Sequence, residues 1–358
     1  MPLTITPGYN WYILFAVGDI TGSLRWTMRF DDKLARRVKL REMRILLAAV
    51  RWGSLAKAAE NLGMSQPAIS KAIAGLEDTF GGALLDRSHS GVQPTMQGKI
   101  LLQRAMNIFD ELRLAGEELE QLADPTRGTV RVACAHAVSA GFLPRVLDAL
   151  SRTHPGIRYS VVEAERAQIF RALREREVDI VVARPPVEEA GSDLEFDALY
   201  EERLFVVAGA RHPLSNQRRR LLPGELASLD WILPTADSAV GQLVETFFRN
   251  MKIPVPPAVV SSMSIHVTCA LLDTGRFVSL LPGSLLAFAP VRSSLHVLPV
   301  DVPETSGPVG ITTVKHRSLT PVAKLFIDHA RKIAEQLNNP DSPRLPRYRP
   351  AATDRKSK

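Results

Sequence analysis

The run SLAKAAENLGMSQPAISKAIAGL places three polar side chains, Gln66, Ser70 and Lys71, close to a serine and a proline. Ser65 suits the N-cap of a helix, and Pro67 suits its first turn, where a missing N–H does no harm. Helical spacing predicts that the three polar side chains lie on the outward face of this helix. Glutamine can pair with the edge of a base and lysine with a phosphate, so the pattern indicates nucleic-acid recognition.

Two short helices joined by a tight turn must position these side chains. Ala59, Leu62, Ile69 and Ile73 are small or apolar, at spacings that pack one helix across another. Gly63 stands where the chain must bend sharply, a position that favours a residue without a Cβ. The arrangement is typical of a helix-turn-helix, which presents its second helix to the major groove of DNA.

A helix before this motif completes the predicted unit. We expect the first helix over Leu40–Arg51, with Met43, Leu47 and Val50 facing the core. The three helices together predict a helix-turn-helix domain.

The charge balance favours contact with a polyanion. The chain has 358 residues and a formal net charge of +7. Twelve basic and five acidic residues lie between Lys33 and Arg104, so the excess is concentrated around the helix-turn-helix. Such an excess favours phosphate contacts and counterion release. A solvated basic face has the same composition, so the charge alone decides little.

A long helix is predicted over Thr95–Leu122, followed by a linker over Asp124–Gly128. Its apolar positions alternate at spacings of four and three residues, which is a heptad seam. They are Leu101, Ala105, Ile108, Leu112, Ala115, Leu119 and Leu122. A helix packed within one chain gives a similar pattern, but the charged remainder favours a seam between two chains. We therefore expect a dimer through this helix.

The rest of the chain alternates strands and helices, which predicts α/β lobes. The first set has strands over 129–133, 157–163 and 178–183 and helices over 142–153 and 168–175. The second set has strands over 204–208, 231–233 and 277–281 and helices over 242–249, 265–274 and 283–288. A strand over 309–314 and a helix over 320–337 return to the first lobe. Two lobes joined by two crossings form a cleft, as in periplasmic binding proteins.

The resemblance to a known family rests on long stretches of the chain. KLREMRILLAAVRWGSLAKAAENLGMSQPAISKAIAGLE and GGALLDRSHSGVQPTMQG resemble the N-terminal domain of LysR-type transcriptional regulators from about Val38 to Gln97. The second stretch resembles the wing of that family, which implies a wing over Asp86–Gln93 and a winged helix-turn-helix domain. The run Gln93–Gly98 departs from the family's usual Leu-Thr-Pro-x-Gly. RVACAHAVSAGFLPRVLDALSRTHPGI and RLFVVAGARHPL resemble its effector-binding domain. The lead-in Arg37–Arg41 is similar to the subgroup of galactose-binding and protocatechuate-type regulators.

The resemblance implies an α/β protein with an all-α N-terminal part and five segments. Residues 1–32 are an extension, 33–94 the winged helix-turn-helix, 95–127 the linker helix, 128–337 the effector domain and 338–358 a disordered basic tail. Within the effector domain, lobe 1 spans 128–202 and 304–337, and lobe 2 spans 203–303. The family usually starts just before its first helix, so the first 27 residues are a misassigned start or a poorly ordered extension.

The resemblance also implies where ligands bind. DNA contacts are expected from Ser54, Ser65, Gln66, Pro67, Ser70, Lys71 and Arg87. Effector contacts are expected from His136, Ser139, Glu165, Arg184, Ser264 and His266. Free N–H groups at the helix start after Ser139 attract anions, and a guanidinium such as Arg184 suits a carboxylate, so the effector is expected to be anionic. Loop packing, or capping of a strand end by Arg184, is the structural alternative.

The expected protein is thus a cytoplasmic regulator that binds double-stranded promoter DNA and a small-molecule effector. It forms a homodimer through the linker helix and a homotetramer, with no cofactor, metal site or membrane contact. No catalytic residues are expected, because no P-loop, Gly-x-Gly-x-x-Gly, His-Glu-x-x-His or Gly-x-Ser-x-Gly occurs. The alternatives are a solute-binding protein or enzyme on a two-lobed α/β scaffold, and a nucleoid-type DNA binder.

Two further features carry less weight. The apolar run Tyr9–Gly18 is too short to span a membrane and has no basic stretch before it, so no signal peptide is expected. Two cysteines in a chain of this length argue against a disulfide framework. Cys134 and Cys269 could form a redox pair, but buried structural thiols are the commoner outcome.

Overall fold

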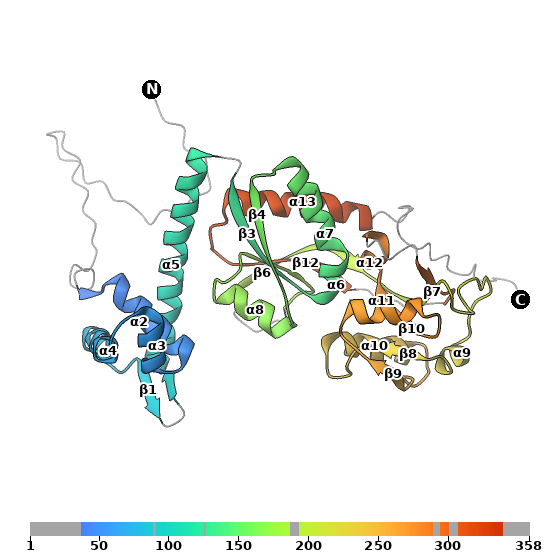
Figure 1. Cartoon of the computed structure of the whole chain (residues 1–358), viewed down its shortest axis with the longest axis horizontal. Helices are drawn as coiled ribbons and strands as arrows, with labels where there is room; N and C mark the ends of the chain where they lie inside the picture. The colour runs from blue at the N-terminus through green and yellow to red at the C-terminus, as the bar shows by residue number, and fades with distance from the viewer. Residues whose placement is uncertain are drawn as a thin grey trace, which may run out of the picture. The chain divides into compact units, whose positions relative to one another are not determined.

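The computed structural model describes residues 37–88, 91–124, 127–186, 193–288, 294–300 and 307–338 (Figure 1). The chain divides into two compact units, with the division between Met106 and Asn107. The predicted extension over 1–32, the start at Met28 and the basic tail beyond Asn338 lie outside the described residues. No helix of the described segments is long and apolar enough to cross a bilayer.

The first unit contains the helix-turn-helix and its wing. Its elements are α2 (Leu40–Trp52), α3 (Leu55–Leu62), α4 (Gln66–Phe80), β1 (Leu85–Ser88), β2 (Gly91–Pro94) and the first part of α5 (Met96–Ala123). β1 and β2 form an antiparallel pair in which Arg87 lies opposite Val92. Ala59, Ile69 and Ile73 are buried as predicted, and Leu62 is half-buried. The winged helix-turn-helix predicted from the sequence is confirmed.

The core face of α2 differs from the prediction. Met43 is buried as expected, but Leu47 and Val50 are only half-buried. The core positions are instead Ile45, Leu46 and Ala49, together with Met43. Both α3 and α4 pack against α2, so its buried face is wider than a single row of residues at i, i+4 and i+7. This face includes Met43, Leu46 and Ala49, which are three positions apart.

The second unit contains two five-stranded sheets. The first has the order β4–β3–β5–β12–β6, formed by β3 (Gly128–Cys134), β4 (Ile157–Glu163), β5 (Ile180–Ala183), β6 (Leu194–Glu202) and β12 (Gly307–Val314). β3 runs parallel to β4 and β5, whereas β12 is antiparallel to β5 and β6. Helices α7 (Phe142–Thr153) and α13 (Pro321–Asn338) cover one face, and α8 (Arg166–Arg174) covers the other (Figure 1).

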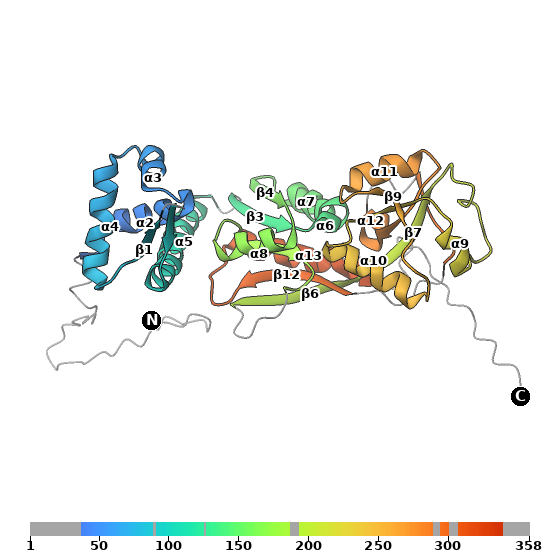
Figure 2. The same ribbon diagram turned by 90° about the horizontal axis from the view of Figure 1, so that it is seen from below.

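The second sheet has the order β11–β7–β10–β8–β9. Its strands are β7 (Leu204–Gly209), β8 (Trp231–Leu233), β9 (Ala258–Ser261), β10 (Val278–Pro282) and β11 (Leu295–Val297). The helices beside it are α9 (Pro223–Ala227), α10 (Ala239–Asn250), α11 (Ile265–Asp273) and α12 (Gly283–Phe288), and Figure 2 shows them in a second view. Trp231 and two phenylalanines of α10 fill the core on one side of this sheet. The prediction of two α/β lobes is confirmed.

The sequence patterns missed five elements: β6, β9, β11, α9 and the short helix α6 (His136–Ala140). β6, β9 and β11 are the outermost strands of their sheets. β9 has an exposed or half-buried side chain at every position, so it lacks the apolar alternation that a half-buried strand shows.

A buried ion-pair network joins the second half of α5 to lobe 1 within the second unit. The Arg317 side chain is 0% exposed, and its Nε and Nη2 donate to both carboxylate oxygens of Asp110 at 2.7 and 2.9 Å. Nη2 also donates to Asp179 Oδ1 at 3.0 Å. Arg113 donates to Asp110 at 2.7 Å and to Asp179 at 3.2 Å, and Arg131 donates to Asp179 at 2.8 and 3.2 Å. Asp110 and Arg317 are thus joined across 207 positions of the sequence.

The electrostatics of the two aspartates follow from these contacts. Burial raises the pKa of the Asp110 carboxyl, but hydrogen bonds and charge from Arg317 and Arg113 outweigh burial, so its pKa lies below the usual range. Burial also raises the pKa of Asp179, and Arg131 and Arg317 outweigh it in the same way. Both groups are therefore carboxylates in the folded protein, and each needs its arginines, because an unpaired buried charge is strongly destabilising.

We predict that Arg317→Met lowers the free energy of unfolding by about 3–5 kcal/mol, since it leaves two buried carboxylates short of partners. Arg331→Met is the control, because its pair with Asp197 is about half exposed and should contribute less than ~1 kcal/mol. Urea unfolding of the full-length protein measures both. Because both aspartate pKa values are depressed, their contribution is complete above about pH 4 and is lost as the pH falls below that. Equal effects of the two substitutions would contradict the prediction.

Candidate functional site

Helix α4 presents the polar face that the sequence predicted. Ile69, Ile73 and Leu76 are buried on its inner side. Gln66, Pro67 and Lys71 are exposed, and Ser70 is half-buried. The side chains suited to base edges and phosphates therefore lie together along the outer face of the first two turns.

Ser54 and Ser65 play a local structural role in this unit. The Ser54 hydroxyl accepts from Lys57 N at 3.4 Å, and the Ser65 hydroxyl accepts from Ala68 N at 3.4 Å. Each caps the N-terminus of a helix, as predicted for Ser65. Gly63 ends α3 with φ +62°, the left-handed conformation that the turn requires.

The wing is fixed against the helices by direct hydrogen bonds. Glu77 of α4 accepts from the backbone N–H groups of Leu84 and Leu85 at 2.9 and 3.3 Å. Val92 N donates to Gly53 O at 3.0 Å. Arg87 is exposed on β1, so its guanidinium is free to reach a phosphate.

Three parallel strands end together at one edge of the first sheet. Cys134 of β3 lies opposite Glu163 on one side and Val182 on the other. Side chains that follow these strand ends therefore share one edge, where ligands bind in open α/β sheets. His136 begins the short helix after β3, Glu165 stands between β4 and α8, and β5 is followed by Arg184.

Acidic and histidine side chains gather at the β3 and β4 ends. His136 Nδ1 contacts Glu163 Oε1, and His136 Nε2 lies 3.7 Å from Glu165 Oε1. Burial raises the pKa of Glu163, but hydrogen bonds from His136 and Ser139 and the charges of His136 and His266 lower it below the usual range. His266 belongs to α11 of lobe 2, so this cluster faces the second lobe.

The helix start predicted after Ser139 is found at Phe142, but a short helix that was not predicted precedes it. A five-residue helix, α6, begins at His136, and α7 begins only at Phe142. Ser139 N donates to Ala135 O at 3.1 Å, and the Ser139 hydroxyl donates to His136 O at 2.8 Å. Ser264 is likewise engaged locally, because its hydroxyl caps α11 by accepting from Val267 N.

Arg184 is half-buried at the end of β5, and it makes no hydrogen bond or ion pair with the residues that the structure describes. Its Nη1 occupies the place that a Cβ on Gly307 would need. Burial lowers the pKa of Arg184, and the charges of Glu202 and Glu201 offset this only in part. No hydrogen bond among the described residues supports the alternative in which Arg184 caps the end of its strand.

The carboxylate of Glu202, whose charge acts on Arg184, is hydrogen-bonded by other groups. Glu202 is buried at the end of β6 and accepts from the Ser284 backbone N–H at 3.1 Å and from the Ser284 hydroxyl. Burial raises the pKa of Glu202. Ser284 lies in the first turn of α12, which packs against α6 and α7 so closely that a Cβ on Gly141 would meet Ser284 O at 2.7 Å. The two lobes are thus in direct contact beside the strand ends.

Arg166 is a residue at this edge that sequence reasoning missed. It is the first residue of α8, and its Nη2 donates to Pro185 O, next to Arg184. Burial lowers the pKa of Arg166. A signal was available, because an arginine three positions after the strand-end residue Glu163 stands at a predictable βα turn.

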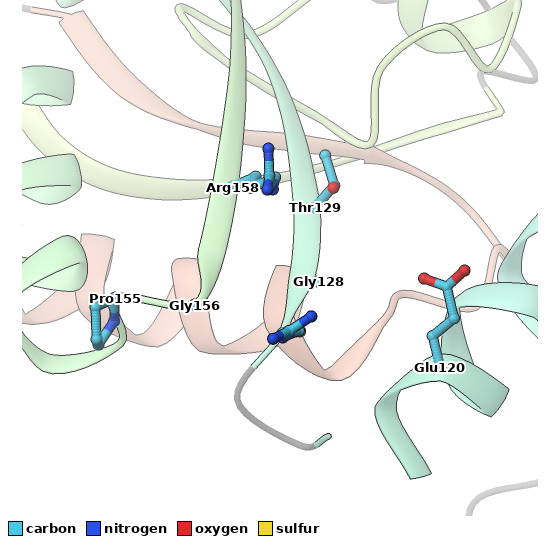
Figure 3. A pocket seen from close by; sticks show the side chains of 7 residues that line it. Glu120, Gly128, Thr129, Pro155, Gly156 and Arg158 are labelled. Atoms are coloured by element: carbon cyan, nitrogen blue, oxygen red, sulfur yellow. The ribbon is translucent and has the colours of Figure 1, made fainter. Parts of the chain in front are cut away.

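A pocket of about 520 Å³ lies at the opposite ends of β3 and β4 (Figure 3). Glu120, Arg127, Thr129 and Arg158 contribute side chains to it. Arg127 is 76% exposed and already pairs with Asp124. The pocket therefore holds none of the residues expected to contact an effector.

Neither cysteine has the environment of a reactive thiol. Burial and the charge of Glu163 raise the pKa of Cys134 to about 12. Burial also raises the pKa of Cys269. Among the described residues, no group of three or more histidine, cysteine, aspartate or glutamate side chains could hold a metal ion.

Comparisons with known proteins agree with this geometry. Residues 40–99 match the family model of the bacterial regulatory helix-turn-helix proteins of the lysR family. Residues 123–335 match the model of the LysR substrate binding domain. The chain is 29% identical over 307 residues to the HTH-type transcriptional regulator PcaQ of Agrobacterium fabrum, covering 84% of this chain and 97% of that protein. It is 29% identical over 302 residues to the regulator GbpR of Azospirillum brasilense, with 84% and 88% covered.

Solved structures share the fold. The crystal structure of CbnR, a LysR family transcriptional regulator, matches with a TM-score of 0.55 and 20% identity, covering 83% of this chain and 99% of that one. A full-length variant of OxyR from Pseudomonas aeruginosa matches with a TM-score of 0.55 and 21% identity, with 83% and 93% covered.

We predict that Cys134 resists alkylation in the folded protein, because its thiol is buried and protonated at neutral pH. Iodoacetamide at pH 8 followed by mass spectrometry should label Cys134 only after unfolding. Cys269 is half-buried and serves as the internal comparison. Rapid native labelling of Cys134, or a peroxide-induced bond between the two thiols, would reverse this assignment.

Proposed function

The chain belongs to the LysR family of DNA-binding transcriptional regulators, and we propose that it senses a small anionic metabolite in the cleft between its two lobes. The observation that carries the anionic class is Arg184, a half-buried guanidinium without a hydrogen-bond partner among the described residues. The matched families are regulators rather than enzymes, so the enzyme alternative is set aside. Acting on promoter DNA places the protein in the cytoplasm.

DNA is read by α4 and held by the wing. Gln66 is exposed in the first turn of α4, where glutamine can form two hydrogen bonds to adenine in the major groove. Ser70 lies one turn further along the same face. Lys71 and Arg87 are exposed cations on α4 and β1, and they suit phosphates on either side of the groove. Ser54, Ser65 and Pro67 shape the helix ends that approach the backbone.

Two chains pair through the exposed part of the α5 seam. Leu101 and Ala105 are buried within the first unit, so this end of the predicted seam packs inside one chain. Ile108, Leu112, Leu119 and Leu122 are 36–81% exposed. An apolar row of this length on a helix favours a partner, and a second copy of the same helix supplies a matching row. Two such dimers form the tetramer.

The effector occupies the edge where β3, β4 and β5 end. Arg184 supplies the charge for a carboxylate, and His136 and Glu165 line the adjoining strand ends. His266 reaches this edge from lobe 2, so a ligand here contacts both lobes. Contacts to both lobes let a ligand select one lobe arrangement, which changes how the DNA-binding units of the assembly are held.

We predict that Gln66→Ala weakens binding to the specific operator by about 1–3 kcal/mol and relaxes the base preference at one position. Lys71→Ala and Arg87→Ala should weaken all DNA binding and reduce the salt dependence by about one unit of slope each. Asp78→Asn, on the exposed last turn of α4, is the control. Gel-shift titrations at several salt concentrations measure these effects. Unchanged operator affinity and preference in Gln66→Ala would mean that another helix face reads DNA.

We predict that Leu112→Lys shifts the protein to smaller species, because it sets a charge against its symmetry mate in a desolvated seam. Glu120→Lys is the control, an exposed position of α5 outside the seam. Light scattering gives the mass, and circular dichroism checks that the lobes stay folded. An unchanged mass for Leu112→Lys would point to pairing through another surface.

We predict that small carboxylates raise the melting temperature of the wild type and that Arg184→Met abolishes this response while gel-shift affinity without ligand is kept. Arg331→Met, an exposed arginine of α13, is the control. A panel of aliphatic and aromatic acids, sugars and amino acids at matched ionic strength is the measurement. Stabilisation by neutral sugars and not by acids would refute the anionic class and leave the two-lobed sensor standing.

A further inference from the structure

Two arginines, not one, supply positive charge at the β5 end of the effector edge. Arg166 of α8 donates to the backbone carbonyl of Pro185, the residue after Arg184, so both arginines belong to the β5 end of the edge. Arg166 is close enough that its charge adds to the lowering of the Arg184 pKa. Two partly buried guanidinium groups repel each other, so an anion between them would relieve both repulsion and desolvation.

The β4 end of the same edge has the opposite character. Glu163 and Glu165 are exposed carboxylates that accept hydrogen bonds and repel anions. His136 lies between them, and His266 of lobe 2 stands near Glu163. The Glu202 carboxylate on the far side of Arg184 is occupied by Ser284, so it does not neutralise the arginines by contact.

The separation of the two ends is set by the strand register. Glu163 and Val182 both lie opposite Cys134, on either side of β3. Two strand spacings of about 4.8 Å put them roughly 10 Å apart, and Arg184 follows two residues after Val182. An extended chain of about eight atoms, which advances about 1.25 Å per bond, spans roughly 9 Å between its end atoms.

We propose that the effector is a bifunctional acid, with a carboxylate held by Arg166 and Arg184 and hydroxyl or ammonium donors held by Glu163 and Glu165. This inference rests on the proposed function and narrows its anionic class. A simple fatty or aromatic acid makes no use of the exposed oxygens of Glu163 and Glu165, and a second anionic end is repelled by them. A neutral polyol leaves Arg166 and Arg184 with only the partial offset that the charges of Glu202 and Glu201 give to Arg184.

The test uses one six-carbon backbone in five forms. Gluconate and 6-aminohexanoate carry both functions, hexanoate carries the acid alone, and glucitol and hexylamine carry the donors alone. The melting temperature of the full-length protein is measured with each at matched ionic strength. We expect at least one bifunctional acid to raise it by about 2–4 °C and each single-function compound to raise it by less.

Variants assign the two ends. Arg166→Met should remove most of the shift caused by the bifunctional acid, whereas Arg171→Met, an exposed arginine on the same helix, should not. In Glu163→Gln, the bifunctional acid should raise the melting temperature only as much as hexanoate does, because the acceptor for its hydroxyl or ammonium donors is weakened. Circular dichroism of each variant checks the fold.

Three results would overturn the proposal. One is a hexanoate shift equal to those of gluconate and 6-aminohexanoate, the second is an Arg166→Met variant that responds like the wild type, and the third is no shift with any compound. The first would leave the anionic effector of the proposed function intact. Failure of the regulator assignment itself would appear separately, as loss of sequence-specific gel shifts by the wild type.

Discussion

The guanidinium of Arg317 has no exposure to solvent and lies between the carboxylates of Asp110 and Asp179. Loss of Arg317 would leave both carboxylates with fewer partners, and a buried ion that loses a partner is strongly destabilising. Asp110 belongs to α5, Asp179 precedes β5, and Arg317 follows β12. The second half of α5 is therefore bound to the first lobe by buried charges.

Because one side of α5 is bound to the first lobe, the two sides of this helix have different roles. Leu114 of α5 is 4% exposed, on the stretch that also carries Asp110 and Arg113. Leu112 and Leu119 stay exposed on the same stretch. A helix that is rigidly attached to a lobe on one side and carries an apolar row on the other transfers any lobe movement to whatever covers that row. Contact between sensor and linker is thus structural, and does not depend on a flexible tether.

Local patterns in the sequence account for much of the fold. The helix-turn-helix follows from Ser65, Pro67 and Gly63 and from apolar spacing, because caps, turns and amphipathic faces are properties of neighbouring residues. The α7 helix and the β4 strand agree with their predicted ranges for the same reason. The Asp110–Arg317 pair had no such signal, since 207 positions separate its members and each alone is an ordinary charged residue. The edge strands β6, β9 and β11 escaped prediction because one or both of their faces lack a continuous apolar row.

The candidate sites differ in the same way. Gln66 and Lys71 could be predicted because one helix orients both. The effector edge collects residues from four segments, and only the chain topology brings Arg166 to the residue that follows Arg184. Ser264 illustrates the limit in the other direction: it lies at the predicted helix start, but its hydroxyl caps that helix. A polar residue in the right loop is informative only when its hydrogen-bonding capacity remains available.

The position of β12 determines how late during synthesis the first lobe can complete its fold. This strand sits between β5 and β6, and α13 after it fills the core of the first lobe, yet both are synthesised last. When lobe 2 has been synthesised, the edge of β5 in the first lobe is still unpaired, and Asp110 and Asp179 still lack Arg317. The helix-turn-helix unit is built from contiguous residues, so all of its elements are synthesised much earlier. Unpaired strand edges promote association between chains, so the nascent sensor depends on rapid completion or on chaperones until its C-terminal strand arrives.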